Sequence, residues 1–589
     1  MHPLVERIVG LRKIEDPETF LHPAYDDRPD PFLMKGMDIA VSRILSALEK
    51  GEKICVWHDY DCDGIPGGAL LFDFFRRIRY APSHAMAGPR MYVPERSEGY
   101  GLNEAGIRKL KEEGVSLIVT VDCGITDIAE AAFAGELGID VIITDHHLPL
   151  PAQAGQAELP PAIAILDAHR ADDTYPFKGL CGTGVAFKLV EALIKKGNFD
   201  IVPGSEKWLL DLVALATVAD MVPLTGENRT LVKYGLTVMR KGRRPGLKAI
   251  FDLDRVPVDA VTEDDLAFSV APKVNASSRM STPTIAFELL TTESSRRAEE
   301  LAAKLLSLNT ERKTEGMRVA KDVKKKIDGM PALSSIIVMG SREWRPSLLG
   351  IAATSVVETY HRTVCLWGAD PSTGSGQAGL IKGSCRSDGT VNIVTLMTEA
   401  KDAFLDFGGH EFSGGFSVSP DAVHELSEKL ESAFVSLNGK PACAGRLALA
   451  EEGLPAQAGL PAAIGAEPEE MEGTLTLAEA NAEAFDALRE LAPFGQGNPK
   501  PVFRFMNVSV AAINRFGKAQ EHARLTLADG SGRERDAIAF FVSRQPFRDA
   551  LDLLSPGDRV TVDAAIERSY FRGRKELRLR IEDIRPVSG

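Results

Sequence analysis

The sequence contains no run of about 18 consecutive apolar residues, which is the length that a membrane-spanning helix requires. Its seven cysteines include no Cys-X-X-Cys pair, so neither a disulfide framework nor a zinc ribbon is indicated, and we expect a reducing compartment. The N-terminal sequence MHPLVERIVG lacks the apolar stretch of a secretion signal. We therefore expect a cytoplasmic protein without membrane contact.

An excess of basic residues is also missing, since 69 lysines and arginines face 83 aspartates and glutamates and the net charge is -14. An acidic surface repels phosphate, which argues against a general nucleic-acid coat. Any nucleic-acid site must therefore be a local groove in which basic side chains gather.

The remaining composition is that of an ordinary globular protein, with 44% hydrophobic, 26% charged and 7% aromatic residues. A chain of 589 residues holds roughly three to five domains. We therefore expect a multidomain α/β protein in which each domain buries its own core.

Residues 51–245 alternate short apolar runs with helical patterns, which is typical of a doubly wound parallel sheet. Functional groups in such a domain lie at the carboxyl ends of the strands. The expected strands are 53–57, 116–121, 140–144 and 162–166.

The rest of the chain is predicted to form four further segments. Five apolar runs of period two near the C-terminus indicate a small barrel of the OB-fold type. The predicted segments are a leader at 1–50, a helical connector at 246–330, a second α/β domain at 331–439, and a linker with the OB barrel at 440–589.

Three carboxylates directly follow the first predicted strand, in the sequence VWHDYDCDG. Asp59, Asp61 and Asp63 lie within five residues, and they repel one another unless a cation neutralises them. A polar loop or a helix cap is the alternative interpretation of this motif taken alone.

The next two strands also end in acid. Asp122 follows 116–121, Asp145, His146 and His147 follow 140–144, and Asp220 ends a predicted helix. Because parallel strands end at the same edge of the sheet, these side chains should meet there. Carboxylates with one or two imidazoles suit Mn²⁺ or Mg²⁺, and a pair of such ions is the usual arrangement for attack on a phosphoryl group.

These motifs carry a family resemblance. DYDCDG, VDCG, DHH and VADMVPL, in this order and spacing, resemble the four motifs of the DHH phosphoesterase superfamily, and FGGH at 407–410 resembles its second, DHHA1-type domain. The segments VPERSEGYGLN, LCGTGVAFKL, APKVNASSRM, GSCRS and LAPFGQGNPKPVF further resemble the RecJ family of single-strand-specific DNA exonucleases.

The resemblance implies a 5′→3′ exonuclease that hydrolyses single-stranded DNA to 5′-mononucleotides with two Mn²⁺ or Mg²⁺ ions, in DNA repair and recombination. It implies that Asp122 bridges the ions, that Asp145 and His147 orient the site and contact the phosphate, and that His410 lies near the scissile phosphate. The implied metal ligands are Asp61, Asp63, Asp122, His146 and Asp220. The implied substrate-binding residues are Arg96, Arg279, Ser384, Arg386, Gly408 and Gly409.

The predicted barrel carries a second candidate DNA site in SYFRGRKELRLRIED. Tyr570 and Phe571 can stack on bases while Arg572 and Arg574 follow the backbone. A charged β-hairpin with an aromatic turn is the alternative.

Some positions depart from the family pattern. Trp57 stands where the superfamily often has histidine, and Arg345 and Ser347 replace the more usual residues of W-H-P-G. Cys62 and Cys123 lie beside predicted ligands, where small buried apolar residues are their simplest interpretation.

Two other functions remain open. One is a DHH phosphodiesterase for short oligoribonucleotides or cyclic dinucleotides, which generally lacks the barrel. The other is a non-catalytic single-strand-binding replication scaffold, which loses metal ligands. For the exonuclease we expect single-stranded DNA as substrate, a single-strand-binding protein and a helicase as partners, and a monomer.

Overall fold

The computed structural model describes residues 1–78, 89–150, 158–330, 333–369, 380–438, 471–517, 520–571 and 574–587. The chain divides into two compact units, the first formed by residues 1–309 and 466–589 and the second by residues 310–465. Within the described ranges, no helix combines the length and the apolar character that crossing a membrane requires.

Five parallel strands form the central sheet of the first unit, in the order β2-β1-β3-β4-β5. This confirms the predicted parallel sheet, to which the structure adds the edge strand β2. The strands are β1 (Lys53–His58), β2 (Arg90–Tyr92), β3 (Val115–Val121), β4 (Asp140–Thr144) and β5 (Ala164–Leu166).

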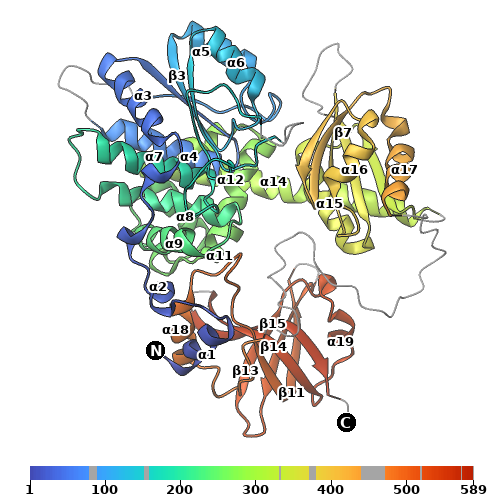
Figure 1. Cartoon of the computed structure of the whole chain (residues 1–589). Coiled ribbons are helices and arrows are strands. Elements are labelled where there is room, and N and C mark those ends of the chain that lie inside the picture. The colour runs from blue at the N-terminus through green and yellow to red at the C-terminus, as the bar shows by residue number, and fades with distance from the viewer. Residues whose placement is uncertain are drawn as a thin grey trace. The chain divides into compact units, whose positions relative to one another are not determined.

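Both faces of this sheet are buried, which explains why its strands are apolar throughout. In β1, Ile54 and Val56 pack into one core and Cys55 and Trp57 into another on the opposite face. Helices cover both faces (Figure 1). They are α3 (Met37–Lys50), α4 (Gly64–Arg77) and α7 (Gly182–Lys196) on the first face, and α5 (Glu104–Glu112) and α6 (Ile128–Glu136) on the second.

A group of helices extends the first core beyond the sheet. The predicted helical connector lies within this group and continues into the longest helix, α14. The helices are α8 (Leu210–Ala219), α9 (Gly226–Met239), α10 (Pro245–Asp254), α11 (Glu263–Asp265), α12 (Ala271–Met280), α13 (Thr284–Thr291) and α14 (Ser295–Asp328).

A closed barrel near the C-terminus follows the order β11-β12-β13-β15-β14, which confirms the five predicted strands and the OB-type fold. Its elements are α18 (Ala482–Leu488), β11 (Phe503–Phe516), β12 (His522–Ala528), β13 (Glu534–Ala539), α19 (Arg548–Leu553), β14 (Arg559–Phe571) and β15 (Arg574–Pro586). The apolar run RLALA at 446–450, within the predicted linker, lies outside the described residues.

The N-terminal residues belong to both cores of the first unit. Val5, Ile8 and Val9 of α1 (Pro3–Leu11) pack into the barrel core, followed by α2 (Pro17–Leu21), whereas α3 packs into the core beside the sheet. The segment that we predicted as a leader therefore contributes apolar residues to two different cores.

Arg229 ties three parts of the first unit together. This buried side chain donates hydrogen bonds to the carbonyl oxygens of Phe20 at 2.7 Å, Leu491 at 2.9 Å and Ala492 at 3.0 Å. Burial lowers the pKa of Arg229 to about 10, so the side chain remains charged at neutral pH. These bonds hold α9 to α2 and to the segment that leads into the barrel.

We expect Arg229→Met to lower the free energy of unfolding by about 3 kcal/mol, because methionine fills the volume but leaves buried carbonyl groups without donors. Denaturant unfolding of the full chain measures this change. Arg296→Met is the control, since the Arg296 side chain is 90% exposed and its replacement should change stability by less than about 0.5 kcal/mol. Equal stability of the two variants would contradict the role of Arg229.

The second unit contains a mixed five-stranded sheet in the order β6-β7-β8-β10-β9, which confirms the second α/β domain. Only β6 and β7 pair in parallel. The elements are β6 (Ile336–Ser341), α15 (Pro346–Tyr360), β7 (Thr363–Ala369), β8 (Ile381–Arg386), α16 (Ile393–Glu399), β9 (Asp406–His410), β10 (Ser413–Val418) and α17 (Leu426–Asn438).

One disulfide corrects an expectation drawn from the cysteine pattern. Cys365 on β7 and Cys385 on β8 are directly opposite in the antiparallel pair and are bonded to each other. Their 20-residue separation carries no sequence signal for pairing, because only the strand register brings them together. Cys62 and Cys123 are buried and free, in agreement with their interpretation as apolar residues.

Candidate metal centre and substrate site

The predicted acidic residues meet at the carboxyl edge of the first sheet. Asp59, Asp122 and Asp145 immediately follow β1, β3 and β4, and their backbone N–H groups donate to the neighbouring strand ends. Asp122 has a φ of 62°, in the left-handed region that non-glycine residues seldom adopt. The sheet therefore places these carboxylates side by side by extending its own hydrogen bonding by one residue.

Asp61 and Asp63 are positioned by helix N-termini. Asp61 accepts hydrogen bonds from the N–H groups of Asp63 at 2.7 Å and Gly64 at 3.2 Å, at the start of α4. Asp63 accepts from the N–H groups of Gly182 at 2.6 Å and Thr183 at 2.8 Å, at the start of α7. Each carboxylate is thus oriented by orphan donors of a helix.

His146 lies at the centre of the cluster. Its Nε2 is 3.1 Å from a carboxylate oxygen of Asp122, 3.6 Å from one of Asp63 and 3.7 Å from one of Asp220, at the end of α8. The structure therefore brings three of the predicted carboxylate ligands around the imidazole of a fourth ligand. The fifth, Asp61, groups with Asp59 and Asp122, with ligand atoms within 4.8 Å of one another.

The electrostatics of the cluster favour a bound cation. Burial raises the pKa of Asp59, Asp122 and Asp220 well above the ordinary aspartate value, and neighbouring carboxylates raise it further. Oδ1 of Asp59 and Oδ1 of Asp122 are buried and make no hydrogen bond within the described part of the chain. Uncompensated buried carboxylates are costly without a positive charge between them, so the donor set fits divalent ions.

His147 is held by two neighbours. Its Nδ1 is 2.7 Å from Oδ1 of Asp145 and 3.1 Å from the hydroxyl of Tyr100, which donates to the Asp122 carbonyl at 2.8 Å. Although burial opposes it, the hydrogen bond to Asp145 raises the pKa of His147 to about 9. Asp145 also accepts from the N–H of Ile125 at 2.9 Å, which fixes its orientation.

The two residues that precede Asp59 do not join the cluster. Trp57 is buried on the opposite face of the sheet, stacks on Tyr92 with ring centroids 4.0 Å apart and donates to the Gly101 carbonyl. His58 is buried, its Nδ1 is 2.8 Å from the Asp59 carbonyl, and burial lowers its pKa to about 4. Both side chains support β1 rather than reach the carboxylates.

Arg96 and Arg279 lie near the loop that carries the acids. Arg96 covers the Tyr60 ring at 4.2 Å and donates to the Ser278 hydroxyl at 3.2 Å. Burial raises the pKa of Tyr60, and the positive charges of Arg96 and Arg279 both oppose this rise, so both lie close to the ring. The structure thus brings these two predicted phosphate contacts to one place in the first unit.

The other predicted phosphate contacts lie in the second unit, on three neighbouring strands. Ser384 of β8, Gly415 of β10 and Gly408 of β9 form one row across the sheet. Arg386 donates to the Ser384 hydroxyl at 2.9 Å, and burial lowers the Arg386 pKa. The adjoining rows hold Gly409 and His410, and the side chain of His410 lies outside the described residues.

The barrel offers aromatic side chains that sequence analysis missed. The ring of His522, at the start of β12, lies between Phe516, at the end of β11, and Phe541, with centroid distances of 5.2 and 4.7 Å. Phe516 is 38% exposed and Phe541 44%. In the sequence, only the two consecutive phenylalanines at 540 and 541 indicated an aromatic cluster here. The side chains of Tyr570, Phe571, Arg572 and Arg574, at the β14–β15 turn, lie outside the described residues.

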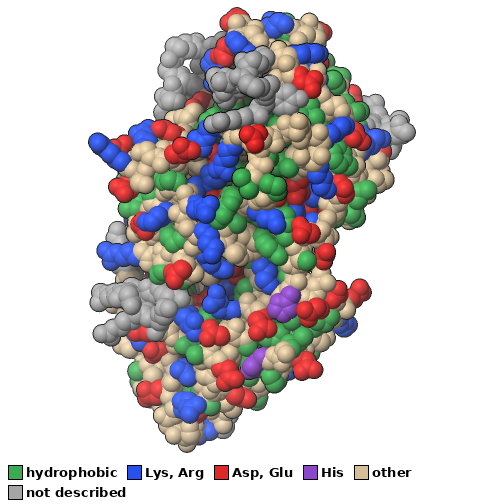
Figure 2. Space-filling model, turned by 90° about the vertical axis from the view of Figure 1, so that its left-hand side faces the viewer, with side chains coloured by type: hydrophobic (Ala, Val, Ile, Leu, Met, Phe, Trp, Pro, Cys, Tyr) green, Lys and Arg blue, Asp and Glu red, His purple; other side chains and the backbone are tan. Residues whose placement is uncertain are grey.

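Charge is unevenly distributed on this chain. The net charge of the chain is -14, and several of its acidic groups are concentrated in the buried cluster. On the face that Figure 2 shows, basic side chains are interspersed with acidic ones. Basic side chains are therefore present on the surface for local contacts with phosphate, although the chain as a whole is acidic.

Three family models match the chain: the DHH family N-terminal domain at residues 53–217, the DHHA1 domain at 332–436 and the RecJ OB domain at 471–583.

Two named relatives match along most of their length. The chain is 32% identical to the single-stranded-DNA-specific exonuclease RecJ of Bacillus subtilis (strain 168), with 99% of this chain and 68% of the relative covered. It is 31% identical to the RecJ of Salmonella typhimurium, with 94% and 91% covered.

A crystal structure of RecJ from Thermus thermophilus in complex with Mn²⁺ is similar to this chain with a TM-score of 0.72 and 26% identity, and covers 100% of this chain and 76% of that one. The ordered motifs, the cluster that they form and the similarity along nearly the whole of this chain agree, and the chain belongs to the RecJ family of single-stranded-DNA-specific exonucleases.

Proposed function

We propose that this protein is a 5′→3′ exonuclease that hydrolyses single-stranded DNA to 5′-mononucleotides with two divalent ions, Mn²⁺ or Mg²⁺. The observation that supports it most directly is the convergence of carboxylates on His146 at one edge of the sheet. The proposed ligands are Asp61, Asp63, Asp122, His146 and Asp220, and Asp59 lies close enough to join them.

When bound, such a pair of ions supplies a hydroxide at neutral pH and neutralises charge at the phosphate. The chain's own groups hold the geometry. Asp61 and Asp63 are fixed by the N-termini of α4 and α7, while Asp145 and Tyr100 hold His147 with its imidazole toward the cluster. We assign His147 a contact with the scissile phosphate, for which a protonated imidazole is suited.

Other residues are proposed to bind the strand. Arg96 and Arg279 of the first unit are assigned phosphate contacts, and so are Ser384 and Arg386 of the second unit, because guanidinium groups suit bidentate phosphate binding. Gly408 and Gly409 leave the phosphate free access to the backbone beside His410, for which we keep a role near the scissile bond. Tyr570, Phe571, Arg572 and Arg574 of the barrel hairpin are assigned contacts with bases and backbone.

Two observations argue against the alternatives. The closed barrel is superfluous for an enzyme of very short oligoribonucleotides or cyclic dinucleotides. A scaffold that does not cut needs no intact acidic cluster, yet this chain keeps it. Because the substrate must be unpaired, we propose that a helicase and a single-strand-binding protein supply the ends, and that the chain acts as a monomer.

A substrate series with Mn²⁺ tests the function. We expect a DNA oligonucleotide of about 30 nucleotides to be degraded, and a cyclic dinucleotide to remain intact. Preference for oligoribonucleotides of a few residues would favour the small-oligonucleotide enzyme, and tight binding without cleavage would favour the scaffold.

The barrel's aromatic cluster provides a prediction about substrate length. OB folds bind oligonucleotides along the face of their second and third strands, and His522 and Phe541 lie at the ends of these strands here. We expect Phe516→Ala combined with Phe541→Ala to weaken binding of long strands about thirtyfold or more, since each stacked base contributes roughly 1 to 3 kcal/mol. Cleavage of strands of about five nucleotides should change little. An equal loss on both lengths, measured by anisotropy and hydrolysis, would contradict it.

Tyr100 is a positioning residue in this proposal. Tyr100→Phe removes the hydroxyl that contacts both the Asp122 carbonyl and His147, so we expect kcat to fall about tenfold with KM nearly unchanged. Tyr92→Phe is the matched control, because that hydroxyl donates to Glu98 instead. Wild-type kcat for the Tyr100 variant would contradict the assignment.

A further inference from the structure

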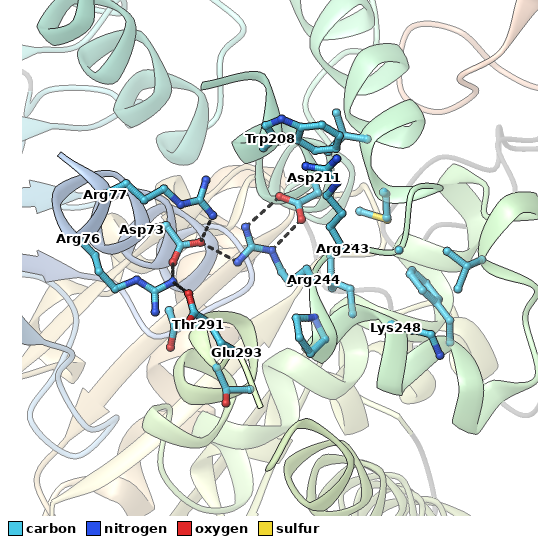
Figure 3. Close-up of a pocket in the computed structure, with 18 residues that line it drawn as sticks. Asp73, Arg76, Arg77, Trp208, Asp211, Arg243, Arg244, Lys248, Thr291 and Glu293 are labelled. Carbon is cyan, nitrogen blue, oxygen red and sulfur yellow. Dashed lines mark hydrogen bonds and ion pairs between the residues drawn. The ribbon is translucent and has the colours of Figure 1, made fainter. Parts of the chain in front are cut away.

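A cavity of 260 Å³ lies in the first unit at the ends of α4 and α8 that are remote from the acidic cluster. Figure 3 shows the side chains that line it. α4 begins beside Asp63 and reaches the cavity with Arg77, and α8 begins at the cavity and ends beside Asp220. With 14 residues, α4 is about 20 Å long. The cavity is therefore a separate feature from the metal centre.

The charged side chains that line the cavity are five basic and three acidic ones, in contrast to the acidic composition of the chain. They are Arg76, Arg77, Arg243, Arg244 and Lys248, and Asp73, Asp211 and Glu293. The local excess of positive charge suits an anionic ligand.

One of the arginines has a structural role. Arg244 donates to Asp211 at 2.7 Å and to Asp73 at 2.9 Å, and this buried network joins α4, α8 and the start of α10 (Figure 3). Asp73 also pairs with Arg76 at 3.0 Å, and Arg76 in turn pairs with Glu293 at 3.1 Å. Lys248 pairs with Asp252 on its own helix. Arg77 and Arg243 are therefore the least compensated cations of the cavity.

Arg77 and Arg243 have donors to spare. The ion pair of Arg77 is a 3.8 Å contact with Asp73, and its side chain is 47% exposed. The Arg243 guanidinium stacks 3.6 Å above the Trp208 ring and forms no ion pair with an acid in the described part of the chain. α10 begins at Pro245, which lines the cavity, without a capping side chain, so its positive dipole end also lies at the cavity.

Apolar side chains also line the cavity. They are Val238, Met239, Leu247, Phe251 and Val258, in addition to Trp208. A ligand that suits both the charged and the apolar side chains carries an anionic group and a flat, weakly polar ring. The volume lies just below the range of small-molecule pockets, roughly 300 to 1,000 Å³, which favours a single small molecule over a polymer.

We propose that this cavity binds a free nucleoside phosphate. Arg77 and Arg243 donate to the phosphate, and the base stacks on the face of the Arg243 guanidinium that is turned away from Trp208, as bases do on arginine side chains elsewhere. The proposal does not depend on the nuclease activity, since none of these residues belongs to the acidic cluster.

Deoxyadenosine monophosphate is a suitable probe, titrated into the full chain in the presence of EDTA so that no divalent ion recruits it to the acidic cluster. We expect saturable quenching of tryptophan fluorescence and a matching calorimetric isotherm. Trp208→Phe should abolish most of the quenching while it keeps the isotherm. Quenching that survives this substitution would place the nucleotide elsewhere and overturn the proposal.

The decisive variant is Arg77→Ala combined with Arg243→Ala, which should weaken binding at least tenfold. Arg108→Ala combined with Arg296→Ala is the matched control, since both side chains are exposed and paired within their own helices. Melting curves verify that both double variants fold. Unchanged affinity in a folded Arg77 and Arg243 variant would overturn the proposal.

Two further ligands identify the chemistry. Inorganic phosphate should bind at least tenfold more weakly than the nucleotide, because it lacks the ring. Equal affinity would mean an oxyanion site and contradict the nucleotide. A twelve-residue oligothymidylate that quenches Trp208 when the free nucleotide does not would assign the cavity to a DNA strand, which also contradicts the proposal.

Discussion

Asp122→Asn should lower kcat for hydrolysis of single-stranded DNA by at least about a thousandfold. Asp122 belongs to two of the three groups of ligand atoms at the sheet edge and lies 3.1 Å from His146. The substitution removes the shared negative charge and hardly changes the side-chain volume. Single-strand binding should therefore remain largely intact, as electrophoretic mobility in EDTA would measure.

The same substitution that removes activity should make the metal-free protein more stable than the wild type at higher pH. Burial and neighbouring carboxylates raise the pKa of Asp122, so the metal-free fold loses stability as the pH rises from the ordinary aspartate pKa through the raised one. Asparagine does not ionise, and the metal-free variant should lose less melting temperature from pH 5 to 8 than the wild type. Mn²⁺ should raise the wild-type melting temperature more than that of the variant.

Asp259→Asn is the matched control, because Asp259 is exposed and belongs to none of the groups of ligand atoms. It should leave kcat and the pH dependence of stability unchanged. If Asp122→Asn cut DNA at a rate close to the wild type, the proposed ligand set would be wrong.

Gly182→Ala should reduce kcat about a hundredfold or more, because misplacement of a catalytic group by about 1 Å has effects of that order. A Cβ at position 182 would lie 2.6 Å from Cβ and 2.8 Å from Cα of Asp122. Either α7 or the strained backbone of Asp122 must then move. The N–H of Gly182 also holds Asp63 at 2.6 Å, so both carboxylates lose their positions together.

Gly184→Ala is the control, because Gly184 lies within one helical turn of Gly182 on α7. Its Cβ would meet Leu180 at 3.4 Å, which is ordinary contact. We expect near wild-type hydrolysis from this variant and similar melting temperatures from both. Full activity of Gly182→Ala would contradict the close approach of α7 to the acidic cluster.

The main elements could be predicted because they depend on local patterns. Apolar runs followed by acid placed Asp122 and Asp145 at strand ends, and period two revealed the barrel. Even the edge at which the carboxylates meet follows from parallel pairing alone. The fold class and the convergence of the acidic side chains could therefore be predicted from the sequence.

Contacts between residues that are far apart in the sequence could not be predicted from it. Gly182 contacts Asp63 across 119 residues, and Tyr100 contacts His147 across 47, without any shared periodicity. The packing of α1 into the barrel core, the Cys365–Cys385 disulfide and the cavity beside Trp208 depend on tertiary packing in the same way. Each required the assembled fold.

The most direct measurement is Mn²⁺-dependent digestion of one DNA oligonucleotide labelled at either end, as a single strand and as a blunt duplex, by the wild type and Asp122→Asn. We predict mononucleotides released from the 5′ end of the single strand only, and none from the variant. Release from the 3′ end, equal digestion of the duplex or hydrolysis by the variant would contradict the account.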